Sequence, residues 1–197
     1  AVAAQPDAAA ELSVRTRRRE SAAGEVARAL AEGRLVKTFA YRGATHLMRP
    51  EDAGVTLALR AASRMWELPS WRTYYGLEPG DWPAFRETVR DALADGPLTR
   101  EELRAAVTSR PAYRHLAFAF EEGSVTLLKA IAWHGDLSLG PSRDGRATFA
   151  RLDHNPRWAG VPPLDEAGPS AVEAYIPAYG PATAAHLDYW LASGLGA

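Results

Sequence analysis

Between residues 81 and 97 the apolar positions recur with the spacing of one helical face. Phe85, Val89 and Leu93 lie four residues apart, which places them on a single stripe of an α-helix. Asp81 is a residue type that caps helix N-termini, and the Gly-Pro pair at 96–97 is typical of a helix end. The pattern therefore predicts an amphipathic helix that begins after Asp81 and ends before residue 96.

Two further helices are predicted along the following 40 or so residues. Thr99 and Glu102 have the spacing of a capping box, in which each side chain binds the backbone N–H of the other residue. That helix is expected to end near residues 109–111, where a proline follows. Helical spacing returns at Val125 and Leu128 and continues to a glycine at 135.

The period of the pattern then changes from helical to alternating. Residues 136–139 and 146–150 alternate apolar and polar side chains, as strands do, and Asp144-Gly145 between them is a strong hairpin signal. Three helices followed by a two-stranded hairpin are typical of a winged helix-turn-helix module, in which the hairpin is the wing. We therefore predict one such module over residues 81–154.

The front of the chain repeats the last parts of this module. Asp7 is expected to cap a helix that runs through Leu12, and Ser21 to cap a second helix that ends at Gly33. A β-rich stretch at 35–41 and a returning stretch at 45–48 then predict another hairpin. This first module lacks an opening helix, so we expect the sequence to be an excerpt of a longer protein.

The tail begins the same pattern a third time, with one helix through Val172 and Ile176 and another capped by Thr183. Repeated units predict a tandem array of winged-helix modules in an α+β, mainly helical fold. The predicted boundaries are 1–65 for the first module, 66–80 for a linker, 81–154 for the second module, 155–168 for a linker and 169–197 for the start of the third.

Composition excludes several classes of protein. Apolar residues make up 47% of the chain and charged residues 24%, which is ordinary for a folded protein. There is no cysteine, which excludes disulfides and thiolate chemistry. No apolar run approaches the roughly 18 residues of a membrane span, and the first residues do not resemble a signal peptide. We expect a cytoplasmic protein associated with the nucleoid, a monomer that contacts no membrane.

Positive charge is concentrated at the front of the chain. The net charge is −1, but residues 1–49 carry +4 and residues 158–197 carry −4, with no basic residue among the latter. Arg17 and Arg18 belong to a basic cluster that also contains Arg15 and Arg19. Such a cluster is either a solvated surface or a stripe that follows the phosphates of a nucleic acid.

The predicted hairpin ends are further candidates for phosphate contact. Arg143 and Arg146 flank the Asp-Gly turn of the second hairpin, and Lys37 and Arg42 belong to the first. A guanidinium fork matches the geometry of a phosphate, although exposed turns also carry charge simply for solubility. His46 on the returning strand is a candidate phosphate contact or a half-buried structural residue. The five histidines lack zinc-ligand spacing and no Gly-rich phosphate loop occurs, so neither metal nor cofactor is expected.

Four segments together resemble a bacterial family of winged-helix DNA-binding proteins that includes the AlkZ-like and YcaQ-like DNA glycosylases. The segments, in chain order, are Leu35-Val36-Lys37-Thr38 with Arg42-Gly43-Ala44-Thr45-His46-Leu47, then 127–137, then Gly140-Pro141-Ser142-Arg143 with Thr148-Phe149, and finally 179–183. The resemblance covers nearly the whole chain with order and spacing preserved.

This resemblance implies a concave scaffold that binds double-stranded DNA, damaged or undamaged, and a β-rich domain beyond residue 197. Family members hydrolyse the N-glycosidic bond of bulky alkylated purines, and some unhook interstrand crosslinks. Their catalytic motif is Gln-x-Gln or Gln-x-Asp, and its second position matches Gln5. The first position matches Ala3, so one catalytic side chain is absent. Glu11 is a nearby carboxylate, either a substitute or a solvated residue.

Three interpretations follow. The first is a DNA glycosylase in which Gln5 orients the hydrolytic water. The second is a DNA-binding or regulatory protein that retained the fold and lost the chemistry, which the alanine at position 3 favours. The third, suggested by the acidic tail, is a set of winged helices that bind other proteins, because a negative surface repels phosphate.

Overall fold

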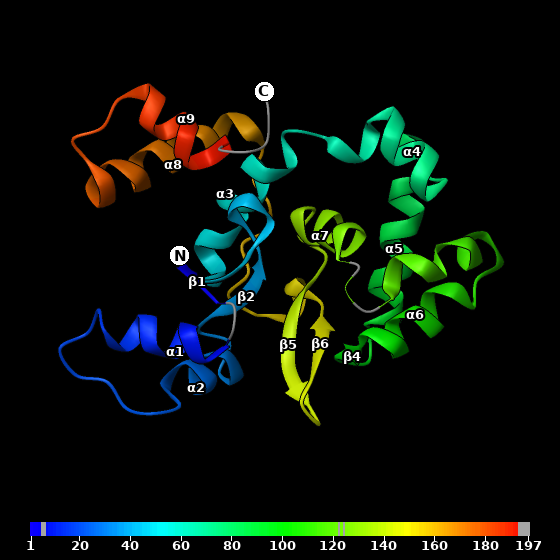
Figure 1. The fold of residues 1–197 in the computed structure, drawn as a ribbon, viewed down its shortest axis with the longest axis horizontal. Coiled ribbons are helices and arrows are strands. Elements are labelled where there is room, and N and C mark those ends of the chain that lie inside the picture. The colour runs from blue at the N-terminus through cyan, green and yellow to red at the C-terminus, as the bar shows by residue number, and fades with distance from the viewer. Residues whose placement is uncertain (5–6, 122, 124, 193–197) are drawn as a thin grey trace.

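The computed structural model describes residues 1–4, 7–121, 123 and 125–192 (Figure 1). The N-terminal part contains β1 (Val2–Ala3), α1 (Asp7–Arg15), α2 (Glu25–Ala31), β2 (Val36–Phe39), β3 (Thr45–Met48) and α3 (Pro50–Ala61). The middle part contains α4 (Pro69–Tyr75), α5 (Trp82–Ala92), β4 (Leu98–Thr99), α6 (Arg100–Thr108), α7 (Thr126–Trp133), β5 (Ser138–Arg143) and β6 (Arg146–Ala150). The C-terminal part contains α8 (Leu164–Tyr179) and α9 (Ala184–Ala192). Short 3-10 segments connect them at Tyr41–Gly43, Met65–Glu67, Pro79–Asp81, Pro111–Phe120 and Leu152–His154.

The strands form one antiparallel sheet, so the fold is α+β as predicted. Its strand order is β1-β3-β2-β5-β6-β4, which joins the two predicted hairpins edge to edge. Lys37 of β2 lies opposite Leu139 of β5, and the Thr38 hydroxyl donates a buried 3.2 Å hydrogen bond to the carbonyl of Leu137. The two hairpins are therefore parts of a continuous sheet.

Helix α7 lies at the centre of the main hydrophobic core. Leu127, Leu128 and Ile131 have no solvent exposure, and Trp133 is 2% exposed. The core extends without interruption from Val36 of β2 to residues of α5, α6 and β6, and therefore includes side chains from both predicted modules. The order of elements from α5 to β6 follows the predicted helices and hairpin, while the division into tandem winged-helix modules stays a prediction.

Several local predictions are confirmed. Thr99 accepts a hydrogen bond from the backbone N–H of Glu102, and the Glu102 carboxylate accepts one from the N–H of Thr99 at 2.8 Å. The hairpin turn places Asp144 and Gly145 in the left-handed region, with φ angles of 52° and 75°. This is the conformation that an Asp-Gly turn between twisted strands requires. A helix is also present at the predicted place, α1 from Asp7 to Arg15, while the capping role of Asp7 stays a prediction.

The predicted start of the second helix is wrong. Helix α2 begins at Glu25, after Gly24 with a φ of 72°, and not after Ser21. Its cap comes from a distant residue, because the Glu11 carboxylate of α1 accepts 3.1 Å hydrogen bonds from the backbone N–H groups of Glu25 and Val26. A carboxylate is stabilised there by the partial positive charge of the helix N-terminus. Glu11 is thus a capping residue that joins α1 to α2.

The segments predicted as linkers contain regular structure. Helix α4 lies inside residues 66–80, and α8 begins at Leu164, before the predicted boundary at 168. Helix α3 was not predicted from the pattern. It packs closely against the segment before α8, because a Cβ added to Gly54 would lie 1.9 Å from the carbonyl oxygen of Gly160. Only glycine permits this approach between the two backbones.

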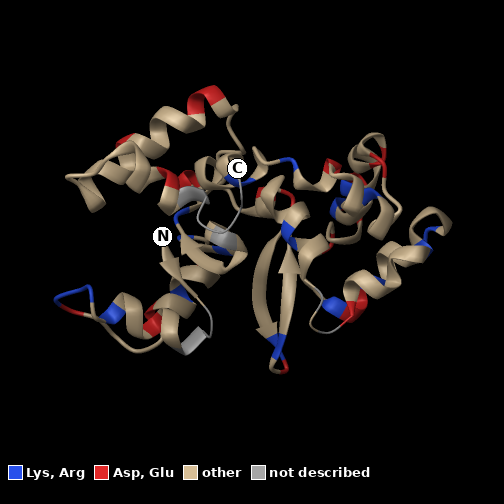
Figure 2. Ribbon diagram, turned by 45° about the horizontal axis from the view of Figure 1, so that its top comes forward, with Lys and Arg blue, Asp and Glu red and all other residues tan. Residues whose placement is uncertain are grey.

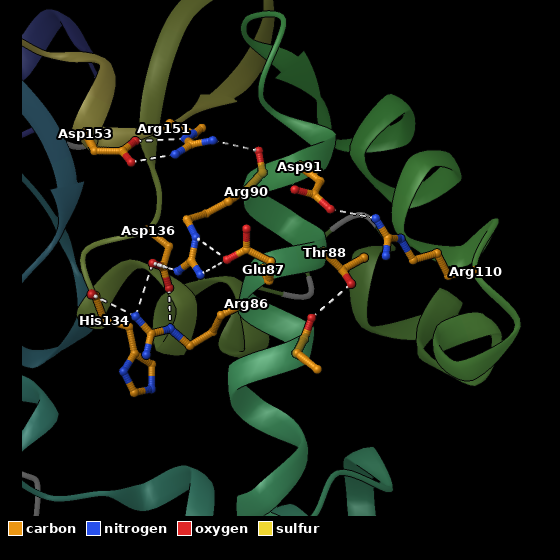
Figure 3. A network of polar contacts seen from close by, with 11 residues as sticks. Arg86, Glu87, Thr88, Arg90, Asp91, Arg110, His134, Asp136, Arg151 and Asp153 are labelled. Atoms are coloured by element: carbon orange, nitrogen blue, oxygen red, sulfur yellow. Dashed lines mark hydrogen bonds and ion pairs between the residues drawn. The ribbon is translucent and has the colours of Figure 1, made fainter.

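A buried carboxylate connects α5 to the turn between α7 and β5 (Figure 3). Asp136 is 6% exposed, and Arg86 and Arg90 of α5 both form ion pairs with it, at 2.5 Å and 2.6 Å. Arg86 also donates a 3.5 Å hydrogen bond to the carbonyl of His134. Because both guanidiniums point at one carboxylate, the network holds α5 in a fixed position against the sheet.

Asp136→Asn tests this network. The substitution removes the negative charge between two partly buried arginines, and we expect it to lower the free energy of unfolding by about 2 to 4 kcal/mol. Urea denaturation measures the change. The control is Glu87→Gln, which removes the exposed partner of Arg90 and should cost less than about 1 kcal/mol. Equal effects of the two substitutions would contradict the assignment.

His134 makes stability depend on pH. Burial, reinforced by the positive charge of Arg86, lowers the pKa of His134 from 6.5 to about 4. Between pH 6.5 and pH 4 the unfolded chain therefore binds a proton at this histidine that the folded chain does not bind. The free energy of unfolding consequently falls as the pH is lowered from 6.5 to 4. We expect His134→Gln to remove about 3 kcal/mol of this pH dependence, measured by thermal or urea unfolding at several pH values. The same substitution at His154, which is exposed, serves as the control.

Candidate functional site

The short strand β1 places residue 3 beside the returning strand of the first hairpin. Val2 pairs with Leu47 and Ala3 pairs with His46. Two hydrogen bonds between Ala4 and Thr45 fix this register. The N–H of Ala4 donates to the carbonyl of Thr45 at 2.9 Å, and the Thr45 hydroxyl donates to the carbonyl of Ala4 at 3.1 Å. In Figure 1 this edge of the sheet lies between the α1–α2 pair and the α8–α9 pair.

Ala3 and Ala4 face in opposite directions. Ala4 is 1% exposed and belongs to a small second core with Ala10, Val26 and Leu47, whereas Ala3 is exposed. Helices α1 and α2 therefore anchor β1 through its buried side chain. Because side chains alternate along a strand, residue 3 is presented on the opposite face of the strand.

The half-buried His46 has a defined ring orientation. Its Nδ1 lies 3.0 Å from the carbonyl oxygen of Ala44, which can only accept, so Nδ1 carries the proton and Nε2 of the neutral ring carries the lone pair. The ring of Tyr41 packs edge-on against the imidazole, with 5.2 Å between the ring centroids. The Tyr41 hydroxyl forms a 3.2 Å hydrogen bond with the Thr56 hydroxyl. Burial raises the pKa of Tyr41, so this phenol stays protonated at neutral pH.

An aromatic cluster that sequence reasoning missed extends from this position to the C-terminal helices. The ring of Trp190 on α9 lies 4.7 Å from that of Tyr41 and 4.9 Å from that of Tyr175 on α8. Tyr179 packs against both Tyr175 and Trp190. The helical spacing of the two α8 tyrosines was visible in the sequence, but the Tyr41 ring that Trp190 contacts lies 149 positions before Trp190 in the chain.

The structure separates the residues predicted for the first hairpin. Gln5 lies outside the described residues. The sequence suggested that Lys37 lies at the end of the first hairpin. In the structure it lies within β2, which is an interior strand of the sheet between β3 and β5. Arg42 belongs to the 3-10 turn that joins β2 to β3, and its side chain lies outside the described part. Of the predicted residues, His46 is the one that the register brings opposite residue 3.

The second hairpin presents both of its predicted arginines near its tip. Arg143 and Arg146 are paired across the turn, and both are exposed. Arg143 forms an ion pair with Glu102 of α6. Arg146 borders a cleft of about 670 Å³ between the hairpin and α6, which Arg100 and Arg104 also line. Figure 2 shows the basic residues at the projecting tip, next to an acidic one.

The basic cluster after α1 is partly neutralised. Arg18 forms an ion pair with Glu25 of α2, and Arg17 donates a 2.8 Å hydrogen bond to the carbonyl of Ser13. The Arg18 guanidinium lowers the pKa of Glu25. Figure 2 shows this basic loop at one end of the molecule, separate from the tip of the β5–β6 hairpin. The helices α8 and α9 carry acidic residues and neither lysine nor arginine.

Two surveys of the described residues complete the description of the site. None of these residues gather into a group of three or more histidine, aspartate or glutamate side chains able to hold a metal ion. Among the described helices, none combines the length and the apolar character needed to cross a membrane.

Comparison with known proteins identifies the family. The family model described as DNA glycosylase AlkZ-like matches residues 1–195. An interstrand DNA cross-link repair glycosylase of Streptomyces sahachiroi is 36% identical over 192 residues, which cover 96% of this chain and 52% of that protein. The solved structure of Streptomyces sahachiroi DNA glycosylase AlkZ superposes with a TM-score of 0.90 at 35% identity, covering 100% of this chain and 53% of that one.

The chain thus spans about half the length of these relatives. The family match nonetheless includes the β1–β3 edge, the hairpins and both C-terminal helices. By the extent of this match and the level of identity, the chain belongs to the AlkZ-like DNA glycosylase family.

Proposed function

We propose that this chain binds double-stranded DNA and excises a damaged base from it by hydrolysing the N-glycosidic bond. The observation that carries the proposal is the match to a cross-link repair glycosylase at 36% identity over 96% of the chain. The substrate class we propose is DNA with bulky N7-alkylated purines, including those that form interstrand crosslinks. No metal or cofactor takes part in the proposed reaction.

The proposed chemistry makes limited demands on the protein. A purine alkylated at N7 is already cationic, so it leaves the sugar as a neutral base and needs no strong general acid. The remaining requirement is a water molecule held near C1′ of the deoxyribose as the bond breaks. A polar side chain within hydrogen-bond reach of that water provides this. We place Gln5 near this water, as the family resemblance implies.

Backbone contacts are proposed to come from three parts of the chain. Arg143 and Arg146 on the β5–β6 hairpin are exposed, as a phosphate contact requires. Arg17 and Arg18 follow α1, and their cluster accounts for much of the +4 charge of residues 1–49. Lys37, Arg42 and His46 complete the proposed set. Tandem winged-helix modules that form a concave surface are part of the same proposal.

A DNA-binding protein without catalytic activity is the second candidate. The specific observation in its favour is Ala3, whose methyl group cannot hold a water molecule at the position where the family motif has its first glutamine. Under this alternative the phosphate contacts remain, and DNA is bound without release of a base.

Base release from alkylated DNA distinguishes the two candidates. We expect the full-length protein to release N7-alkylated purines from duplex DNA, measured as free base by chromatography. Gln5→Ala should lower the release rate about tenfold or more, because the water loses a hydrogen-bond partner. An unchanged rate would contradict the role of Gln5. DNA binding without any release, even after Ala3→Gln, would favour the non-catalytic candidate.

The hairpin contact is tested by salt dependence. Arg146→Ala should weaken binding to all DNA sequences alike and reduce the slope of log K against log salt by about one unit. Fluorescence anisotropy at several salt concentrations measures both quantities. The matched control is Arg72→Ala on α4, an arginine held in an ion pair with Glu78, which should leave the slope unchanged. Equal slopes for Arg146→Ala and the wild type would exclude this contact.

A further inference from the structure

Two positively charged side chains meet where α3 packs against α7 (Figure 1). The guanidinium of Arg60 on α3 lies 4.0 Å above the ring of Trp133 on α7. Lys129 precedes Trp133 by four residues, so these two α7 side chains are neighbours on one face of that helix. Arg60 and Lys129, here called the cation pair, are therefore close together. Burial, reinforced by the positive charge of Arg60, lowers the pKa of Lys129.

The cation pair has no negative partner in the part of the chain that the structure describes. None of the described aspartates and glutamates forms an ion pair with either side chain. Arg60 is 8% exposed, and its Nε is buried without a hydrogen-bond acceptor. Its Nη2 donates to the sulfur of Met65 at 3.3 Å, and a thioether is a weak acceptor. Buried charges are normally paired, because their removal from water is otherwise costly.

The cation pair lies beside the turn that joins β2 to β3. A Cβ added to Gly43 in this turn would lie 3.3 Å from Nζ of Lys129. Thr56 lies one helical turn before Arg60 on the same face of α3, and its hydroxyl forms the hydrogen bond with Tyr41, which opens the β2–β3 turn. Helices α3 and α7 thus each bring one cation to the neighbourhood of a single turn.

This turn adjoins the position where the family motif has its first glutamine. The Tyr41 ring packs edge-on against the ring of His46, with 5.2 Å between the centroids. His46 pairs with Ala3, which matches that motif position. An anion held by the cation pair therefore lies near the edge where the proposed function places the hydrolytic water.

The ligand that suits the cation pair is a phosphodiester. A guanidinium offers N–H donors in a fixed fork, and an ammonium acts as a compact point charge. Together they match a group with one negative charge and two oxygens that are not esterified, which is the form of a DNA backbone phosphate. Lys129 is half-buried, so a phosphate can approach from its side without α7 entering a groove.

We propose that Arg60 and Lys129 bind one of the two DNA phosphates that flank the damaged nucleotide. This inference rests on the proposed function and adds a site to the contacts proposed above. It differs from them because Arg60 is a buried cation, whereas the hairpin arginines are exposed. The phosphate supplies the negative charge that the described residues do not provide, and its position fixes the sugar of the damaged nucleotide beside the β1–β3 edge.

Methylphosphonate substitution in the DNA tests this contact, because it replaces a charged phosphate oxygen with a methyl group. The full-length protein is titrated by fluorescence anisotropy with alkylated duplexes that carry the change on either side of the lesion, with a 2′-fluoro sugar to prevent base release. At one of the two positions we expect the wild-type affinity to fall about tenfold. Lys129→Met should lower the affinity for the unmodified duplex by a similar factor, and the methylphosphonate should then have no further effect.

Stability without DNA separates binding from a structural role. Lys129→Met removes the repulsion within the cation pair, so the free energy of unfolding in urea should stay the same or rise. Arg60→Met is the second variant and should also abolish the methylphosphonate effect. The matched control is Arg110→Met, which removes one positive charge from an exposed arginine paired with Asp91 and should leave the effect at about tenfold. Far-ultraviolet circular dichroism verifies folding, and Lys129→Gln is used if Lys129→Met does not fold.

The outcomes separate this inference from the function on which it rests. Loss of the methylphosphonate effect in both variants, with the stability of Lys129→Met retained, supports it. An effect of the same size in the wild type and the variants overturns it, as does the absence of any effect at both flanking positions. A lower free energy of unfolding for Lys129→Met also overturns it, because the lysine then has a partner within the protein. Failure of the proposed function is seen separately, as a wild-type protein that releases no base from alkylated DNA.

Discussion

Strands β2 and β5 meet edge to edge, and this pairing determines much of the remaining architecture. Each strand belongs to a hairpin that the local sequence predicts. The two strands are joined where Lys37 pairs with Leu139 and the Thr38 hydroxyl donates a hydrogen bond to the carbonyl of Leu137. Pairing removes two exposed strand edges at once, which would otherwise invite association with other chains. It also brings the two hairpins against one helix, α7.

The burial of α7 bears on the DNA contacts that we propose for this chain. In many helix-turn-helix proteins the last helix before the wing enters the major groove. Here Leu127, Leu128 and Ile131 of that helix are fully buried, and the guanidinium of Arg60 on α3 lies 4.0 Å above the ring of Trp133. A helix surrounded on this scale cannot also lie in a groove. Arg143 and Arg146 of the second predicted module are instead exposed at the hairpin tip, and Arg146 also borders the cleft beside α6.

The β1–β3 edge shows how a weak element is fixed by its surroundings. A two-residue strand has little stability alone, yet β1 is held by the Ala4–Thr45 hydrogen bonds and by the small core that Ala4 shares with Val26 and Leu47. The carboxylate of Glu11 joins α1 and α2 behind it. Residue 3 and His46 are therefore held by contacts from β3, α1 and α2 together.

Local interactions determined what could be predicted from the sequence alone. The Thr99 capping box, the Asp144-Gly145 turn and the start of α1 depend on residues a few positions apart, so their patterns predict them directly. The family also followed from the sequence, because its motifs are short and ordered along the chain. The cap on α2, the interior position of Lys37 and the aromatic contacts of Trp190 could not be predicted in this way. They depend on pairs far apart in the chain, and only the packed sheet brings Ala3 opposite His46, because a strand register is a property of two segments together.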